Sequence, residues 1–137
     1  MRRLVLAIGA ISLLACGGDS TGLGAASAVG TWNLVTINGG ALPFTAYETA
    51  SPPYKLEIVS DQFVASSNGA FSDAITTREN DNGTITTSTI NTPGTWSQSG
   101  NTLTVTEAST GFVTTATISG NSVTVSDQGM VSVYHRQ

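Results

Sequence analysis

The stretch GTWNLVTIN (residues 30–38), followed by Gly39-Gly40, decides the fold class of this chain. It reads as a β-strand that ends at a glycine turn. Similar short segments with turn-like links recur to the end of the chain, which predicts an antiparallel meander. The further predicted strands are residues 54–60, 63–67, 71–78, 84–91, 94–98, 102–107, 112–118, 122–126 and 130–136.

The links between these segments are predicted from their turn chemistry. Residues 41–53 contain three prolines and are expected to form a long connection with at most a short helical turn. Asp61-Gln62 and the tripeptide TPG (92–94) are expected to be turns. Asn68-Gly69 predicts a type I′ hairpin, because both residues tolerate positive φ.

Composition favours strands and a closed sheet. Threonine and valine are abundant, charged residues make up only 10% of the chain, and no segment repeats apolar residues at helical spacing. An open sheet would leave unpaired edges with few charges to prevent aggregation, whereas a barrel has no free edges. We therefore expect an all-β fold, one small antiparallel meander β-barrel of about 8–10 strands, over residues 29–137.

The N-terminal segment MRRLVLAIGAISLLACGGDS (1–20) has the layout of a secretory signal. Two arginines precede an apolar run over residues 4–15, which is shorter than the roughly 20 residues of a membrane-spanning helix. Cys16 is the only cysteine, so no disulfide framework is possible. Small and polar residues follow it, and residues 16–28 are expected to form a flexible tether.

The end of this run, Leu13-Leu14-Ala15-Cys16, resembles the lipobox of bacterial lipoproteins. The resemblance implies that residues 1–15 are a signal peptide and that Cys16 receives lipid, with acyl chains such as palmitate. Gly17 stands where the family's inner-membrane retention signal has aspartate, which favours the outer membrane of the cell envelope. The membrane is therefore the expected partner, through this anchor.

Charge excludes another class of partner. Without residues 1–15, the chain has three basic and nine acidic residues, which gives a net charge of −6. Such a surface repels the phosphates of nucleic acids. Nucleic-acid binding is therefore not expected.

The segment VGTWNLVTINGGALP (29–43) resembles the opening strand of lipocalin-like domains of bacterial lipoproteins, within the calycin group of small barrels. The later segments GTWSQSGNTLTV (94–105), TATISGNSVTVSD (115–127) and VSVYHR (131–136) agree with this resemblance. The META-type domain of heat-shock lipoproteins has a similar opening and is the alternative family. In lipocalins the tryptophan of the opening motif lies at the closed end of the barrel, beneath a basic residue of the last strand. By this resemblance Trp32 and Arg136 form a structural pair.

The residues give little support for catalysis, and no enzyme, cofactor or metal is expected. His135 is the single histidine, and no motif supplies a nucleophile or an orienting acid beside it. A zinc-ligand cluster and a Gly-rich phosphate loop are both absent from the sequence. The segment ENDNG (79–83) offers Glu79, Asp81 and Asn82 as oxygen ligands for calcium, but a hairpin turn explains it better.

Two functions remain open. The first is binding of a small apolar or amphipathic ligand inside the barrel, and the second is a META-like envelope or stress protein whose filled core contacts a protein partner. Residues 41–53 are expected either to form a lid on the barrel or to clamp its end. An open interior of a few hundred Å³ would favour the first function. The candidate pocket or core residues are Tyr54, Leu56, Ile58, Phe63, Phe71, Trp96, Leu103 and Phe112.

Overall fold

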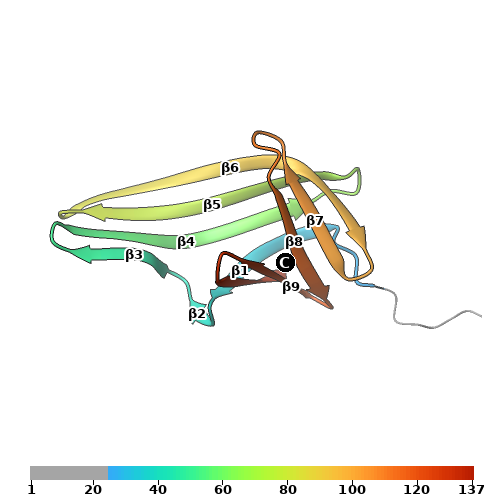
Figure 1. The fold of residues 1–137 in the computed structure, drawn as a ribbon, viewed down its shortest axis with the longest axis horizontal. Coiled ribbons are helices and arrows are strands. Elements are labelled where there is room, and N and C mark those ends of the chain that lie inside the picture. Colours follow the sequence, from blue (N-terminus) through green and yellow to red (C-terminus); the bar gives the residue numbers. More distant parts are fainter. Residues whose placement is uncertain (1–24) are drawn as a thin grey trace, which may run out of the picture.

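The computed structural model describes residues 25–137, and the predicted signal peptide and Cys16 lie outside these described residues. Within residues 25–137, no helix has the length and apolar character needed to cross a membrane. Ten strands make up the fold (Figure 1). They are β1 (Gly30–Ile37), β2 (Gly40–Ala41), β3 (Phe44–Ala50), β4 (Pro53–Ala65), β5 (Ala70–Asp81), β6 (Thr84–Ser99), β7 (Thr102–Glu107), β8 (Val113–Ser119), β9 (Ser122–Asp127) and β10 (Met130–Arg136).

Eight of these strands close into an antiparallel barrel. The hydrogen-bonded order is β2-β1-β10-β9-β8-β7-β6-β5-β4-β3, and β1 also pairs with β4. The closing contact joins residues 30–33 of β1 to residues 62–65 of β4. The predicted fold, an all-β antiparallel meander barrel, is confirmed.

The predicted break at Asp61-Gln62 is wrong, because β4 runs through it. Asp61 pairs with Ile75 and Gln62 with Ala74, and a bulge between Ile58 and Ser60 absorbs the irregularity. A bulge bends and twists a strand without ending it. The sequence signal read as a turn therefore lies just beyond a bulge in a single 13-residue strand.

The predicted turn at residues 92–94 is also wrong, because β6 continues through it as a 16-residue strand. Gly94 pairs with Phe71 of β5 on one side and with Glu107 of β7 on the other. A Cβ at Gly94 would clash with the backbone carbonyl oxygen of Thr106. Glycine is needed at position 94 because the backbone of β7 approaches closely there, and not because the chain reverses direction.

Residues 41–53 form no helical turn, and most of them belong to the edge strand β3, which pairs with the first half of β4. The three prolines occupy the ends of β3 and its turn into β4, where a missing N–H is tolerated. Pairing with β3 extends β4, β5 and β6 well beyond the barrel (Figure 1). We call this region, residues 44–58 and 76–91, the projecting sheet.

The two Asn-Gly hairpins differ. Gly69 alone has positive φ, and its N–H donates to Ser66 O at 3.0 Å, so the type I′ prediction at Asn68-Gly69 is wrong. Asn82 and Gly83 both have positive φ, +48° and +89°, and form the hairpin turn expected for ENDNG.

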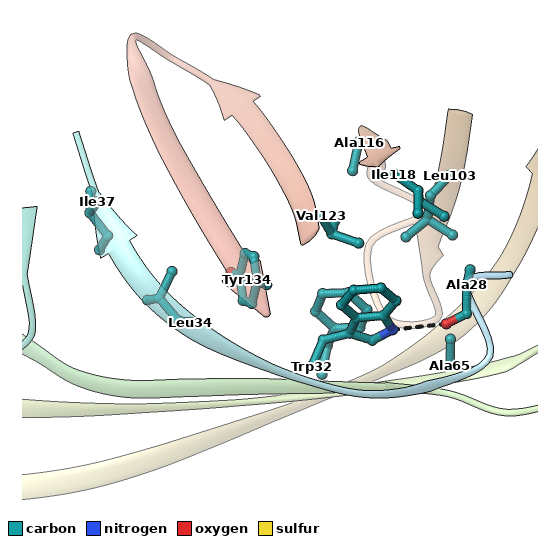
Figure 2. Packing of buried hydrophobic residues seen from close by; sticks show 11 residues of the cluster. Ala28, Trp32, Leu34, Ile37, Ala65, Leu103, Ala116, Ile118, Val123 and Tyr134 are labelled. Carbon is teal, nitrogen blue, oxygen red and sulfur yellow. Dashed lines mark hydrogen bonds between the residues drawn. The ribbon is translucent and has the colours of Figure 1, made fainter. Parts of the chain in front are cut away.

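One end of the barrel is closed around Trp32, which is completely buried. Its indole Nε1 donates to Ala28 O at 2.8 Å (Figure 2). Its ring stacks on Phe63 with centroids 5.9 Å apart. Phe63 in turn meets the ring of Tyr134 edge-on at 5.1 Å. These rings link β1, β4 and β10 in one core, which explains why the closing strand pairs remain in register.

Arg136 covers this closed end. Its guanidinium carbon lies 4.2 Å from the Trp32 ring centroid, and its nitrogens donate to the carbonyl oxygens of Ser27 and Val29. A Cβ at Gly30 would meet the guanidinium at 2.7 Å, and φ there is +146°, so this position requires glycine. The contact expected between Arg136 and Trp32 is present, and its stabilising role stays a prediction.

Replacing Arg136→Ala is expected to lower the free energy of unfolding by about 2–3 kcal/mol, because a cation–π contact and two hydrogen bonds to carbonyl groups are lost. The thermal midpoint should fall by several degrees. Arg78→Ala, which breaks a partly buried ion pair on the projecting sheet but leaves Glu57 paired with Lys55, is the control and should lower the midpoint less than Arg136→Ala. Equal midpoints for the Arg136 variant and the wild type in thermal unfolding would refute a structural role.

Candidate functional site

A cavity of about 290 Å³ lies inside the barrel. Met130 begins β10 and Arg136 ends it, so the cavity opens at the barrel end opposite the Trp32 contact. Most of the lining is aromatic and aliphatic, with a few polar groups. The lining residues are Phe63, Phe71, Asp73, Leu103, Val105, Glu107, Phe112, Thr114, Ala116, Val123, Val125, Asp127, Met130, Ser132 and Tyr134.

A buried carboxyl lies behind this lining. Asp61 of β4 is only 8% exposed, and its Oδ2 accepts a hydrogen bond of 2.7 Å from the Tyr134 hydroxyl. Its other oxygen, Oδ1, is buried and has no hydrogen-bond partner within the described structure. A buried charge with an unsatisfied oxygen is costly, which makes this residue the most unusual in the barrel.

Asp73 of β5 is the neighbour of this carboxyl. Burial, followed by hydrogen bonding to Asp61 and its charge, raises the pKa of Asp73 from the ordinary value of 3.8 to about 8. At neutral pH Asp73 therefore holds a proton, which it can donate to Asp61. Burial and the Asp61 charge also raise the pKa of Tyr134, so its hydroxyl remains a donor.

The acidic residues of the cavity have no basic residue beside them in its lining. Asp73 lies within it, and Glu107 and Asp127 lie at the ends of β7 and β9, where it opens. Thr110 donates to the Glu107 carboxylate at 2.7 Å and fixes one side of this rim. The arrangement therefore combines an apolar interior with a negative potential.

The family model for the lipocalin-like domain matches residues 29–131. The chain belongs to the lipocalin-like domain family. A comparison with curated proteins finds no match for the chain. The eight-stranded barrel with an internal cavity agrees with this family.

Four of the eight predicted pocket or core residues line the cavity of this lipocalin-like domain: Phe63, Phe71, Leu103 and Phe112. Ile58 and Trp96 are partly buried and pack against the core without lining the cavity. Trp96 donates from Nε1 to Ser66 O at 2.9 Å, which ties β6 to the turn after β4.

Tyr54 and Leu56 do not line the cavity, and predicting them as pocket residues was wrong. Both lie on the projecting sheet, because pairing with β3 carries the first half of β4 outside the barrel. Tyr54 packs against Tyr47 with ring centroids 6.0 Å apart. On the opposite face Glu57 accepts from Lys55 at 2.8 Å and pairs with Arg78 at 2.7 Å, and these hydrogen bonds lower the pKa of Glu57.

Residues 41–53 are neither a lid on the cavity nor a clamp on its mouth, since none of them lines it. Leu42 and Phe44 are partly buried and pack against the hydrophobic core.

The acidic pair and Tyr134 were missed by sequence reasoning. The sequence predicts Asp61 as a turn residue. Asp73 falls on the same strand face as Phe71 and Ile75, and a carboxyl among inward apolar residues was the available signal.

His135 and the segment ENDNG (79–83), which the sequence offers as candidates for catalysis or metal binding, do not line the cavity. His135 is exposed on β10. In ENDNG, Asn80 Oδ1 accepts from the Gly83 N–H at 3.0 Å, as suits a turn. Among residues 25–137, no three histidine, cysteine or acidic side chains are grouped closely enough to hold a metal ion.

Asp73→Asn is expected to remove a pH dependence of stability. The unfolded chain loses the Asp73 proton near pH 3.8, whereas the folded domain retains it up to about pH 8, so wild-type stability falls as pH rises across this window. The asparagine amide still donates to Asp61 and does not ionise. The thermal midpoint of the variant should therefore exceed that of the wild type at pH 8 and match it near pH 4.

Thermal unfolding between pH 4 and pH 9 measures this difference. Glu79→Gln, which removes an exposed carboxylate on the projecting sheet, is the control and should leave the wild-type pH profile in place. Parallel profiles for Asp73→Asn and the wild type would contradict the protonated acid pair.

Proposed function

We propose that this lipocalin-like domain binds one small apolar or amphipathic molecule in its cavity and does not convert it chemically. The observation that carries the proposal is the cavity of about 290 Å³. Ligand pockets begin at about 300 Å³, so the space suits a compact molecule. A barrel of eight strands is just wide enough to hold such a ligand.

Small side chains support this reading over a filled core. Thr114, Ala116 and Ser132 face the cavity from β8 and β10 at positions where larger residues would fill it. A solid core was the main feature of the alternative, a META-like structural or stress protein. The open volume weighs against that alternative.

The chemistry of the lining supports binding without catalysis. Histidine, cysteine and lysine are absent from the residues that line the cavity. The proton of Asp73 is shared with Asp61, and the Asp61 carboxylate is already bound by Tyr134. Among the described residues, neither carboxyl group lies beside a hydroxyl or thiol that it could activate as a nucleophile, apart from the Tyr134 hydroxyl, whose raised pKa keeps it protonated.

We also propose that the domain is anchored by lipid at Cys16 in the cell envelope, with the outer membrane favoured. The support is the lipobox-like sequence Leu13-Leu14-Ala15-Cys16 and the small, polar stretch after it. Several acyl chains, each contributing about 0.8 kcal/mol per buried methylene, would hold the domain at the membrane surface.

Filling the cavity should abolish binding. Thr114→Phe places a ring inside the barrel, whereas Thr115→Phe places the same ring on the exposed outer face of the same strand. We expect the Thr114 variant to bind an apolar fluorescent probe at least about tenfold more weakly than the wild type, and the Thr115 variant to bind it normally. Fluorescence titration of the full-length protein measures this, and equal affinities for both variants would place the probe outside the cavity and refute the proposal.

Cys16→Ser should abolish the lipid anchor. Cells grown with radiolabelled palmitate should label the wild type and leave the variant unlabelled, because no thiol remains to start the modification. The wild type should sediment with membranes, and the variant should lose this association if no uncleaved signal holds it. Labelling of the variant to the wild-type level would rule out Cys16 as the anchor.

A further inference from the structure

The cavity is lined by acidic residues and by no basic residue. Asp73, Glu107 and Asp127 line the cavity, and Asp61, which is not part of the lining, interacts with Asp73. The three basic residues of the described chain all lie elsewhere. Lys55 and Arg78 bind Glu57 on the projecting sheet, and Arg136 covers Trp32 at the closed end.

This separation leaves the carboxyl groups of the cavity without any cation from the protein itself. Negative charge inside a low-dielectric wall attracts positively charged ligands and repels anions such as fatty acids. We propose that the ligand of the cavity is a small organic cation, an amine or quaternary ammonium group joined to an apolar body. This inference rests on the proposed function and specifies its ligand class.

The interior offers contacts to both parts of such a ligand. Phe63, Phe71, Phe112 and Tyr134 bring four aromatic rings to the lining. Aromatic faces attract quaternary ammonium groups by cation–π interaction and also cover the apolar body. Ser132 and Thr114 add hydroxyl groups without adding charge.

The Oδ1 atom of Asp61 is a second, separate observation, because it is a buried acceptor that lacks a hydrogen-bond donor among the described residues. The residue is more than nine-tenths buried, lies on the inward face of β4 beside Phe63, and one of its oxygens has no hydrogen-bond partner in the described structure. The protonated carboxyl group of Asp73 is a neutral hydrogen-bond donor to Asp61 and brings no positive charge to it. A cation bound against Asp73 would take the place of that proton and leave the net charge of the pair unchanged.

The replacement makes binding depend on pH. The groups that face Asp73 are Asp61 on β4, Glu107 on β7, Asp127 on β9 and Tyr134 on β10, and none is basic. Because a cation competes with the Asp73 proton, its affinity should rise as the pH increases toward 9, whereas the affinity of a neutral molecule should not change.

Two probes of the same shape separate charge from hydrophobicity. Phenyltrimethylammonium keeps its positive charge at every pH, and tert-butylbenzene is its neutral counterpart. Isothermal titration calorimetry on the full-length protein at pH 6 and pH 9 compares their affinities. We expect the cation to bind about tenfold more tightly at pH 9 than at pH 6, and the neutral probe to bind equally at both.

Substitutions of Asp73 and Asp127 test whether these carboxyl groups cause the pH-dependent binding of the cation. Asp73→Asn should weaken cation binding at pH 9 by about tenfold and remove its pH dependence, with no change for the neutral probe. Asp127→Asn, at the exposed rim, should weaken the cation by a smaller factor, and it keeps the test valid if the Asp73 variant does not fold. Glu79→Gln, on the same strand as Asp73 but outside the cavity, is the matched control and should behave as the wild type.

The outcomes distinguish the two proposals. If the neutral probe binds and the cation does not, the cation proposal is overturned and ligand binding in the cavity stands. The same holds if the cation binds with an affinity that does not depend on pH and does not change in either aspartate variant. No binding of either probe to wild type or variants, together with equal dye binding by Thr114→Phe and Thr115→Phe, would overturn both.

Discussion

The short pairing between β1 and β4 is the contact on which the rest of the structure depends. Only residues 30–33 and 62–65 take part, yet this pairing converts a ten-stranded sheet into a closed eight-stranded barrel. It sets Trp32 opposite Phe63 on the inner face, and the stacked rings hold the register. A slip of one residue would turn Asp61 and Phe63 outward and bring Gln62 and Val64 into the core.

Closure also creates two chemically different barrel ends. At one end the backbone preceding β1 crosses the opening, bound by Gln98 through Ala26 and Ala28 and covered by Arg136. At the other end the strands stop at acidic residues around an apolar space. The basic and acidic groups are thereby separated along the barrel, so the closed end supplies stability while the open end remains accessible to a ligand.

Local signals predicted much of this fold, and long-range pairing decided the remainder. The strand at residues 30–38 and the turn at Asn82-Gly83 depend on nearby residues, so the sequence was sufficient for them. Asp61-Gln62 and residues 92–94 resemble turns locally, but a continuous neighbouring strand kept both in the sheet. Half of the predicted pocket residues reached the cavity. The raised pKa of Asp73 could not be predicted from the sequence, because it depends partly on Asp61, which is 12 positions away and on another strand.

The bulge in β4 has a consequence for how this chain can vary. Before it, the even-numbered residues Tyr54, Leu56 and Ile58 share one face; after it, the odd-numbered Asp61 and Phe63 occupy the continuation of that face. Val59 is the unpaired residue of the bulge, so the residues on this face have even numbers before it and odd numbers after it. Removing this one residue would leave Ile58 opposite Thr77 and Ser60 opposite Thr76, so the strand would lose its bulge and both faces would keep their orientation. Removing a paired residue such as Leu56 would instead invert the part of β4 that precedes it. Lengthening the hairpin at Asn82-Gly83 by one residue on each strand would preserve both faces. A single-residue deletion in β4 is therefore tolerated at the bulge, and other length changes of the projecting sheet are tolerated in pairs at its tip.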